Sequence, residues 1–224
     1  MCRLFLYISR DTRYVPSAYL EQFINIARDG LSKKCGFKPH GDGFGVVWVN
    51  DSGYGIYRSL KPIWEEDISL PPAKLFLFHA RKAGIGDINL LNTHPFVKKG
   101  LILAHNGNIY GFSRKPIKYP VNGNTDSEKF LSILIDFLDY YGDLEKAFIE
   151  SIKSIDLATE LNMIIISILE RKVVGSNLYF KPRYNCPNYS TMWIKKTNSE
   201  LLVASEPLSN DNWSTLSKEI GTLT

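Results

Sequence analysis

The chain opens with Met1-Cys2-Arg3-Leu4-Phe5-Leu6-Tyr7-Ile8, in which a cysteine and one basic residue precede an apolar run. Residues 3–8 are typical of a short buried strand. The run is too short for the core of a secretory signal peptide, and no cleavage motif follows it. Position 2 is an unusual place for a structural cysteine. Taken by itself, however, Cys2 fits a small apolar side chain buried at the start of a strand.

Beyond this stretch, hydrophobic periodicity and turn residues predict a cluster of helices and several antiparallel strand pairs. The predicted helices cover residues 17–33, a segment starting at the capping box Thr125-Asp126-Ser127-Glu128, and a segment capped by Asp143. The predicted strands are residues 44–49, 55–58, 75–81, 101–105, 163–169, 172–180, 191–195 and 200–204. Adjacent strand pairs indicate mixed α and β structure with antiparallel sheets rather than an alternating parallel fold. No linker divides the chain, so we expect one domain over residues 1–224.

The composition argues against several classes of protein. The 224 residues carry a net charge of +4 with scattered basic residues, so no nucleic-acid partner is expected. No stretch reaches the roughly 18 apolar residues of a membrane span. We therefore expect no membrane partner and a cytoplasmic protein. Cys2, Cys35 and Cys186 are odd in number and lack Cys-x-x-Cys spacing, so neither a disulfide framework nor a zinc site is expected.

Polar and glycine-rich segments that could carry chemistry fall at predicted strand ends and helix starts, where sites usually form. They are Cys2; Gly41-Asp42-Gly43-Phe44-Gly45; His79-Ala80-Arg81; Asn92-Thr93-His94-Pro95-Phe96; Ala104-His105-Asn106-Gly107; Thr125-Asp126-Ser127-Glu128; and Ala204-Ser205-Glu206-Pro207-Leu208. In this order, and over nearly the whole chain, they resemble the free-standing form of the class II glutamine amidotransferase domain. That family belongs to the N-terminal-nucleophile hydrolases. The resemblance implies an α+β fold, a four-layer αββα sandwich with two stacked antiparallel sheets.

The resemblance also implies a catalytic apparatus. Cys2 would become the first residue once Met1 is removed, so that its thiol is the nucleophile and its α-amino group the general base. The side-chain amide of Asn106 and the backbone N–H of Gly107 would stabilise the oxyanion. On its own, Asn-Gly after a strand is an ordinary turn.

For substrate binding, the resemblance implies that Arg81 binds the α-carboxylate and Asp126 the α-ammonium group. His94 is counted with them, although the amine of Cys2 leaves no need for a histidine base. His79 fits a core position, and His105 and Asp42 are expected to order the glycine-rich loops. Lys82 and Gly84 depart from the family pattern, so the substrate is less certain than the reaction.

The predicted function is cleavage of a γ-glutamyl amide, of glutamine or of a γ-glutamyl compound, through a thioester at Cys2. Ammonia would be released or passed to a separate synthase subunit, and neither a cofactor nor a metal is expected. One alternative is a catalytically silent glutamine-binding or regulatory subunit. Another is a metal-dependent hydrolase, but the spacings of its candidate ligands match no helical metal motif; these ligands are His40, Asp42, His79, His94 and His105.

Overall fold

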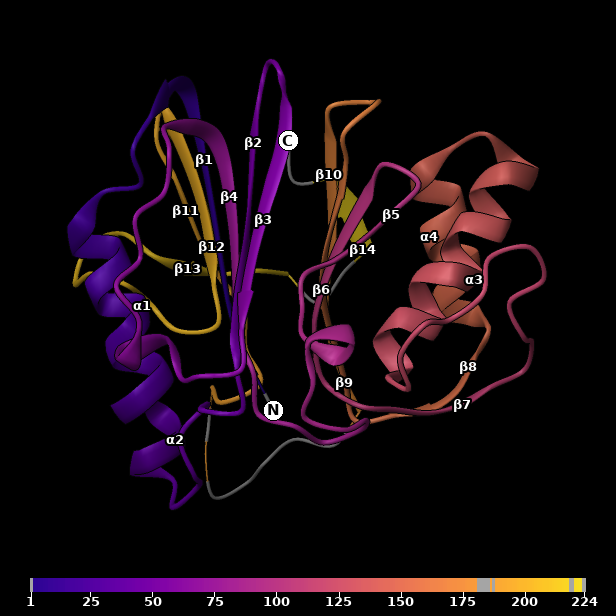
Figure 1. Ribbon diagram of the computed structural model, residues 1–224, viewed down its shortest axis with the longest axis horizontal. Coiled ribbons are helices and arrows are strands. Elements are labelled where there is room, and N and C mark those ends of the chain that lie inside the picture. The colour runs from indigo at the N-terminus through magenta and orange to yellow at the C-terminus, as the bar shows by residue number, and fades with distance from the viewer. Residues whose placement is uncertain (1, 181–185, 187, 218–219, 223–224) are drawn as a thin grey trace.

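The computed structural model describes residues 2–180, 186, 188–217 and 220–222. Two antiparallel sheets pack face to face, and helices cover the outer face of each sheet (Figure 1). This arrangement confirms the predicted α+β fold with stacked antiparallel sheets. Within the described ranges, every helix is too short or too polar to cross a membrane.

The first sheet places the strand that follows Cys2 at its centre. Among the described residues it has seven strands in the order β13-β11-β12-β1-β4-β2-β3. Their bounds are β1 (Arg3–Arg13), β2 (Phe44–Asn50), β3 (Gly53–Ser59), β4 (Ala73–Ala80), β11 (Trp193–Lys196), β12 (Glu200–Ala204) and β13 (Ser214–Thr215). Since β1 lies between β4 and β12, the residue before β1 is surrounded by the ends of other strands.

The second sheet carries the strand that ends in Asn106. In the part of the chain that is described, its five strands follow the order β14-β10-β9-β6-β5. Their bounds are β5 (Phe96–Lys98), β6 (Leu101–Asn106), β9 (Glu160–Ser167), β10 (Lys172–Tyr179) and β14 (Ile220–Thr222). A separate small pair joins β7 (Ile109–Phe112) to β8 (Ile155–Ala158).

Side-chain caps mark the starts of two of the three longer helices. The longer ones are α1 (Ser17–Asp29), α3 (Asp126–Tyr141) and α4 (Leu144–Lys153), and the shorter turns are α2 (Leu31–Lys34), η1 (Ile63–Glu65) and η2 (Leu90–Asn92). The Thr125 hydroxyl accepts from Glu128 N at the start of α3, and Asp143 accepts from Lys146 N at the start of α4. The capping box is only half formed, because the Glu128 carboxylate binds Asn122 N and Gly123 N instead.

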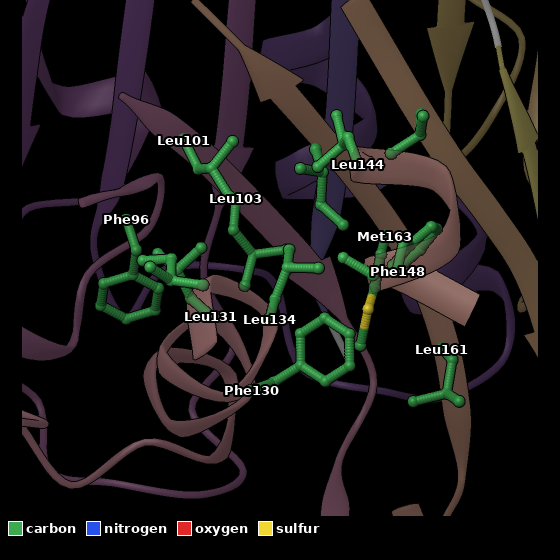
Figure 2. Packing of buried hydrophobic residues seen from close by; sticks show 14 of the residues in the cluster. Phe96, Leu101, Leu103, Phe130, Leu131, Leu134, Leu144, Phe148, Leu161 and Met163 are labelled. Atoms are coloured by element: carbon green, nitrogen blue, oxygen red, sulfur yellow. The ribbon is translucent and has the colours of Figure 1, made fainter. Parts of the chain in front are cut away.

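Three apolar cores hold the layers together. Alternate residues of β1 supply two of them, since successive side chains of a strand point to opposite faces. Phe5 and Tyr7 pack in the core beneath α1, whereas Leu4 and Leu6 pack in the core between the sheets. The third core lies between the second sheet and α3 and α4 (Figure 2); its labelled members include Leu103, Phe130, Leu131, Leu134, Phe148 and Met163.

Several expectations about secondary structure need correction. The helix predicted over residues 17–33 stops at Asp29, because Gly30 has an extended backbone, and a separate turn follows. The strands β5, β7, β8, β13 and β14 were not predicted. The two predicted hairpins, around residues 170–171 and 197–199, are confirmed.

The expectation of no disulfide was wrong. Cys35 and Cys186 are bonded, with their Cα atoms 5.7 Å apart. Within the described part of the chain, Cys2 is the free cysteine. The odd number of cysteines therefore reflects one thiol and one bridge. The partners are 151 residues apart in the sequence, and no local spacing could have paired them.

The Asp143 cap offers a direct test of this architecture. Replacing Asp143 with Ala removes the 2.7 Å hydrogen bond to Lys146 N. We expect the free energy of unfolding to fall by about 1 kcal/mol, as measured by urea denaturation. Asp156→Ala is the matched control, because Asp156 is exposed and lies outside the helix caps. Equal effects of the two substitutions would contradict the capping role.

Candidate active site

Cys2 lies where the two sheets meet. Its backbone N–H donates to Oδ1 of Asn106, at the end of β6, over 2.6 Å. The loop after β4 flanks its thiol, since Lys82 N–H donates to Cys2 Sγ over 3.4 Å and Sγ lies 3.5 Å from the Lys82 carbonyl oxygen. Strands from both sheets therefore position this one residue.

The environment of Cys2 keeps its thiol protonated. Cys2 is 8% exposed, and burial raises the pKa of the thiol, while the Lys82 N–H and the Arg81 guanidinium lower it. Burial is the larger influence. The thiolate is the reactive form of cysteine, so a reaction at Cys2 requires a base close to Sγ.

Asn106 presents a buried hydrogen-bond donor beside Cys2. Its side chain is almost completely buried, its Oδ1 accepts from Cys2, and its Nδ2 has no hydrogen-bond partner among the described residues. Unpaired buried N–H groups are rare because each one costs desolvation free energy. A negatively charged oxygen would supply the missing acceptor. The next residue must be glycine, because its φ is +154° and a Cβ atom there would collide with the Glu160 carbonyl.

Arg81 and Asp126 approach Cys2 from the loop after β4 and from the start of α3. The Arg81 guanidinium is held by carbonyl oxygens of its own loop, at 3.0 Å from Asp87 and 3.1 Å from Gly86. Asp126 Oδ2 accepts from Ile109 N over 2.6 Å. Both charges act on the Cys2 thiol, Arg81 lowering its pKa and Asp126 raising it. The structure thus brings together four of the predicted site residues: Cys2, Asn106, Arg81 and Asp126.

The glycine-rich loop at residues 41–45 orders the segment beside the thiol. Asp42 Oδ2 accepts from Lys82 Nζ over 2.9 Å and from Ala83 N over 2.8 Å. Backbone hydrogen bonds join Asp42 and Gly43 to Arg81. Sequence reasoning expected the ordering role of Asp42 but missed Lys82 as a contact of the thiol. That contact is made by the main chain of Lys82, so no side-chain pattern could have indicated it.

His94 lies in a stack of rings. Its imidazole is 4.2 Å from that of His79 and 4.4 Å from the Phe96 ring, and neither ring nitrogen has a hydrogen-bond partner among the described residues. His79 Nε2 lies 3.1 Å from the His105 carbonyl, and the His105 ring contacts Ser127 Oγ and the Glu160 carbonyl. Burial is the main cause that lowers the pKa of His79 to about 3 and that of His94 well below its ordinary value.

His40 lies apart from this stack, with Nδ1 3.0 Å from the Ala27 carbonyl. The candidate metal ligands His40, Asp42, His79 and His105 thus each contact a different partner instead of converging on one point. Within the described residues, no group of three or more His, Cys, Asp or Glu side chains is placed to hold a metal ion.

The buried histidines make stability depend on pH. They stay neutral in the fold but gain a proton in the unfolded chain below about pH 6.5. Stability is therefore complete above that pH and falls as the pH drops toward the folded values, by at most about 1.4 kcal/mol per pH unit for each histidine. We expect His94→Leu to lose less stability than the parent between about pH 7 and pH 4, measured by urea denaturation. Phe96→Leu alters the same stack without a titrating group and should retain the parental slope; a parental slope in His94→Leu would contradict this account.

Comparison with known proteins identifies the family. The model for "Glutamine amidotransferases class-II" matches residues 20–165. A Haemophilus influenzae protein named "Putative glutamine amidotransferase" is 30% identical over 124 residues, which are 49% of this chain and 42% of that protein. The chain thus spans less than half the length of this relative.

Solved structures agree on the fold. A "predicted glutamine amidotransferase" from Pseudomonas aeruginosa PA01 superposes with a TM-score of 0.64 at 18% identity, over 100% of both chains. The glutamine phosphoribosylpyrophosphate amidotransferase from B. subtilis gives a TM-score of 0.58 at 15% identity, over 91% of this chain and 42% of that one. At these identities the likeness concerns the fold alone. With the family model matching more than half of its residues, the chain belongs to the class II glutamine amidotransferases.

Proposed function

We propose that this chain cleaves the γ-glutamyl amide bond of glutamine, or of a γ-glutamyl compound, through a thioester at Cys2. One observation carries the proposal most directly. A single side-chain amide, that of Asn106, accepts from Cys2 N over 2.6 Å and keeps a buried Nδ2 without a partner among the described residues. The same group can hold the nucleophilic residue and donate to the oxyanion that forms next to it.

The proposed mechanism begins with removal of Met1, which converts the Cys2 nitrogen into an amine that the Asn106 oxygen can still hold. With a pKa near the reference range of about 7.7–8.0, this amine takes the thiol proton. The thiolate attacks the γ-carbonyl carbon, and Asn106 Nδ2 and the Gly107 N–H stabilise the resulting oxyanion. On collapse, the ammonium of Cys2 returns its proton to the leaving nitrogen. The released product is ammonia or an amine. Water or another amine then attacks the thioester carbon and gives up a proton to the Cys2 amine, the C–S bond breaks, and the departing Cys2 sulfur takes that proton back.

Substrate recognition is assigned to Arg81 and Asp126. Arg81 would bind the α-carboxylate through guanidinium hydrogens that its loop carbonyls leave unused, and Asp126 would bind the α-ammonium group through Oδ1. This is supported by the burial of both groups and by their electrostatic influence on Cys2. A contact between His94 and the substrate stays a prediction, because the described contacts of its ring are with other aromatic rings.

The fate of the nitrogen and the location of the protein stay predictions. Ammonia would be released or passed to a separate synthase subunit. The Cys35–Cys186 bridge is of a kind that persists in oxidising compartments and in intracellular proteins of hyperthermophiles.

The first test is covalent labelling by a diazoketone analogue of glutamine, followed by mass analysis of the N-terminal peptide. We expect a chain that begins at Cys2 and carries one label there, because Cys2 is the free thiol of the described residues. Cys35 and Cys186 serve as internal controls, since both are bonded. An intact Met1 in an active preparation would refute the mechanism. Binding of glutamine without label or hydrolysis would favour the silent-subunit alternative.

The second test addresses the oxyanion donor. Asn106→Ala should lower kcat for γ-glutamyl amide hydrolysis by roughly 10²–10³, the usual cost of removing one such donor. The far-ultraviolet circular dichroism spectrum should stay unchanged. Asn198→Ala, in an exposed turn between β11 and β12, is the matched control and should keep the parental rate. A parental kcat in Asn106→Ala would remove Asn106 from the proposed site.

A further inference from the structure

We propose that Arg3 is a positioning residue for Cys2, and that Glu206 and Tyr189 hold Arg3 in place. This inference rests on the proposed function for its meaning, because it assigns Arg3 to the alignment of the nucleophile. It also gives a role to Ser205 and Glu206, in the segment Ala204–Leu208 that the family resemblance singled out.

The Arg3 side chain donates a hydrogen bond to the main-chain carbonyl of Cys2. This side chain is completely buried, and its Nη1 donates to the Cys2 carbonyl oxygen over 3.3 Å. At the other end of the same residue, Cys2 N donates to Asn106 Oδ1. Side chains therefore hold the main chain of Cys2 on both sides of its Cα atom. With both sides fixed, the direction of the Cα–Cβ bond is fixed, and with it the position of Sγ relative to the nitrogen that serves as base.

Glu206 neutralises this buried guanidinium. Its Oε1 lies 2.8 Å from Arg3 Nη2, and its carboxylate also accepts from Leu31 N, at the start of α2. The preceding residue, Ser205, exchanges hydrogen bonds with the main chain of Leu4. Residues 205 and 206 thus hold the first two residues of β1, the strand that directly follows the nucleophile. A buried charge requires such a partner, because desolvation alone would strongly disfavour it.

Tyr189 covers the face of the Arg3 guanidinium. The guanidinium carbon lies 4.5 Å from the centre of the Tyr189 ring, which is itself buried. The Tyr189 ring packs 4.9 Å from that of Phe37, and Tyr189 N donates to the carbonyl of Cys186. The Cys35–Cys186 bridge joins these two short segments covalently. The disulfide thereby restrains the two segments that position Tyr189 over Arg3.

The Arg3–Glu206 pair makes the reactivity of Cys2 sensitive to charge. Removing the cation leaves a buried carboxylate near Cys2, which disfavours the thiolate, whereas removing the carboxylate leaves a buried cation, which favours it. The other groups that face Cys2 are unchanged in both cases. They are the Arg81 guanidinium, the Lys82 N–H and the Asp126 carboxylate, together with the α-amino group that removal of Met1 would expose on Cys2.

The test measures the rate of Cys2 alkylation by iodoacetamide against pH, on full-length protein whose N-terminus has been checked by mass. The alkylation rate rises with pH as the thiol loses its proton. Arg3→Gln should move this rise to higher pH, and Glu206→Gln should move it to lower pH. The double variant should return toward the parental curve, and Arg3→Lys, which keeps a cation, should lie nearer to the parent than Arg3→Gln. Opposite shifts from the two single variants are a result that a merely structural role of the pair would not give.

Hydrolysis of glutamine is measured on the same preparations. With the carbonyl side of Cys2 no longer held by Arg3, kcat of Arg3→Gln should fall by about 10–10²-fold with little change in KM, as expected for misplacement of a reacting group. Arg10→Gln is the matched control, because Arg10 is an exposed arginine of the same strand. If Arg3→Gln does not fold, Glu206→Gln still decides the sign of the alkylation shift.

Two failures can be told apart. A parent protein that is alkylated at Cys2 but hydrolyses no γ-glutamyl amide would overturn the proposed function, while its alkylation curves still decide the role of Arg3. Parental alkylation curves and parental kcat in folded Arg3→Gln and Glu206→Gln would overturn the positioning role alone.

Discussion

The hydrogen bond from Cys2 N to Asn106 Oδ1 joins the two sheets at the point where the proposed chemistry occurs. It can form only if β1 and β6 lie at a fixed separation and in one register. The apolar core between the sheets sets that separation through residues of both strands, such as Leu4 and Leu6 from β1 and Ile102 and Ala104 from β6. Burial of apolar area thus places a polar contact that could not order two sheets by itself.

The packing around Asn106 also leaves no room for a side chain on the residue that follows it. β6 pairs with β9 up to Asn106 and Asn162, and Gly107 then turns the chain against the Glu160 carbonyl. The His105 ring contacts that same carbonyl through Nε2. A side chain at position 107 would push β6 away from β9 and move the Asn106 amide. The glycine is therefore required by the packing around the site as well as by the proposed approach of an oxyanion.

Sequence patterns predicted the parts of the structure that local rules determine. The helix after Thr125, the helix after Asp143 and both hairpins were recognisable from caps and turns. Asn106, Gly107 and Asp126 were singled out as site residues only through the family resemblance. Short strands such as β5, with three residues, contain too little periodicity to be seen. Three contacts form only when the chain has folded into its tertiary structure. They are the bridge between Cys35 and Cys186, the contact of the Lys82 main chain with the thiol, and the hydrogen bond from Arg3 to Cys2 with its support by Glu206. None of these has a local signature.

The two buried arginines beside Cys2 differ in whether a carboxylate of the protein balances their charge. Arg3 is paired with the Glu206 carboxylate at 2.8 Å, so its charge is neutralised within the protein. Arg81 is equally buried, but among the described residues it has no carboxylate within 4.0 Å and is held by neutral carbonyl oxygens. Carbonyl dipoles satisfy hydrogen bonds without cancelling the charge, so Arg81 keeps an electrostatic requirement for an anion. In the proposed function, the α-carboxylate of the substrate meets that requirement. The Arg3 guanidinium cannot bind it in the same way, because the Glu206 carboxylate already occupies that side.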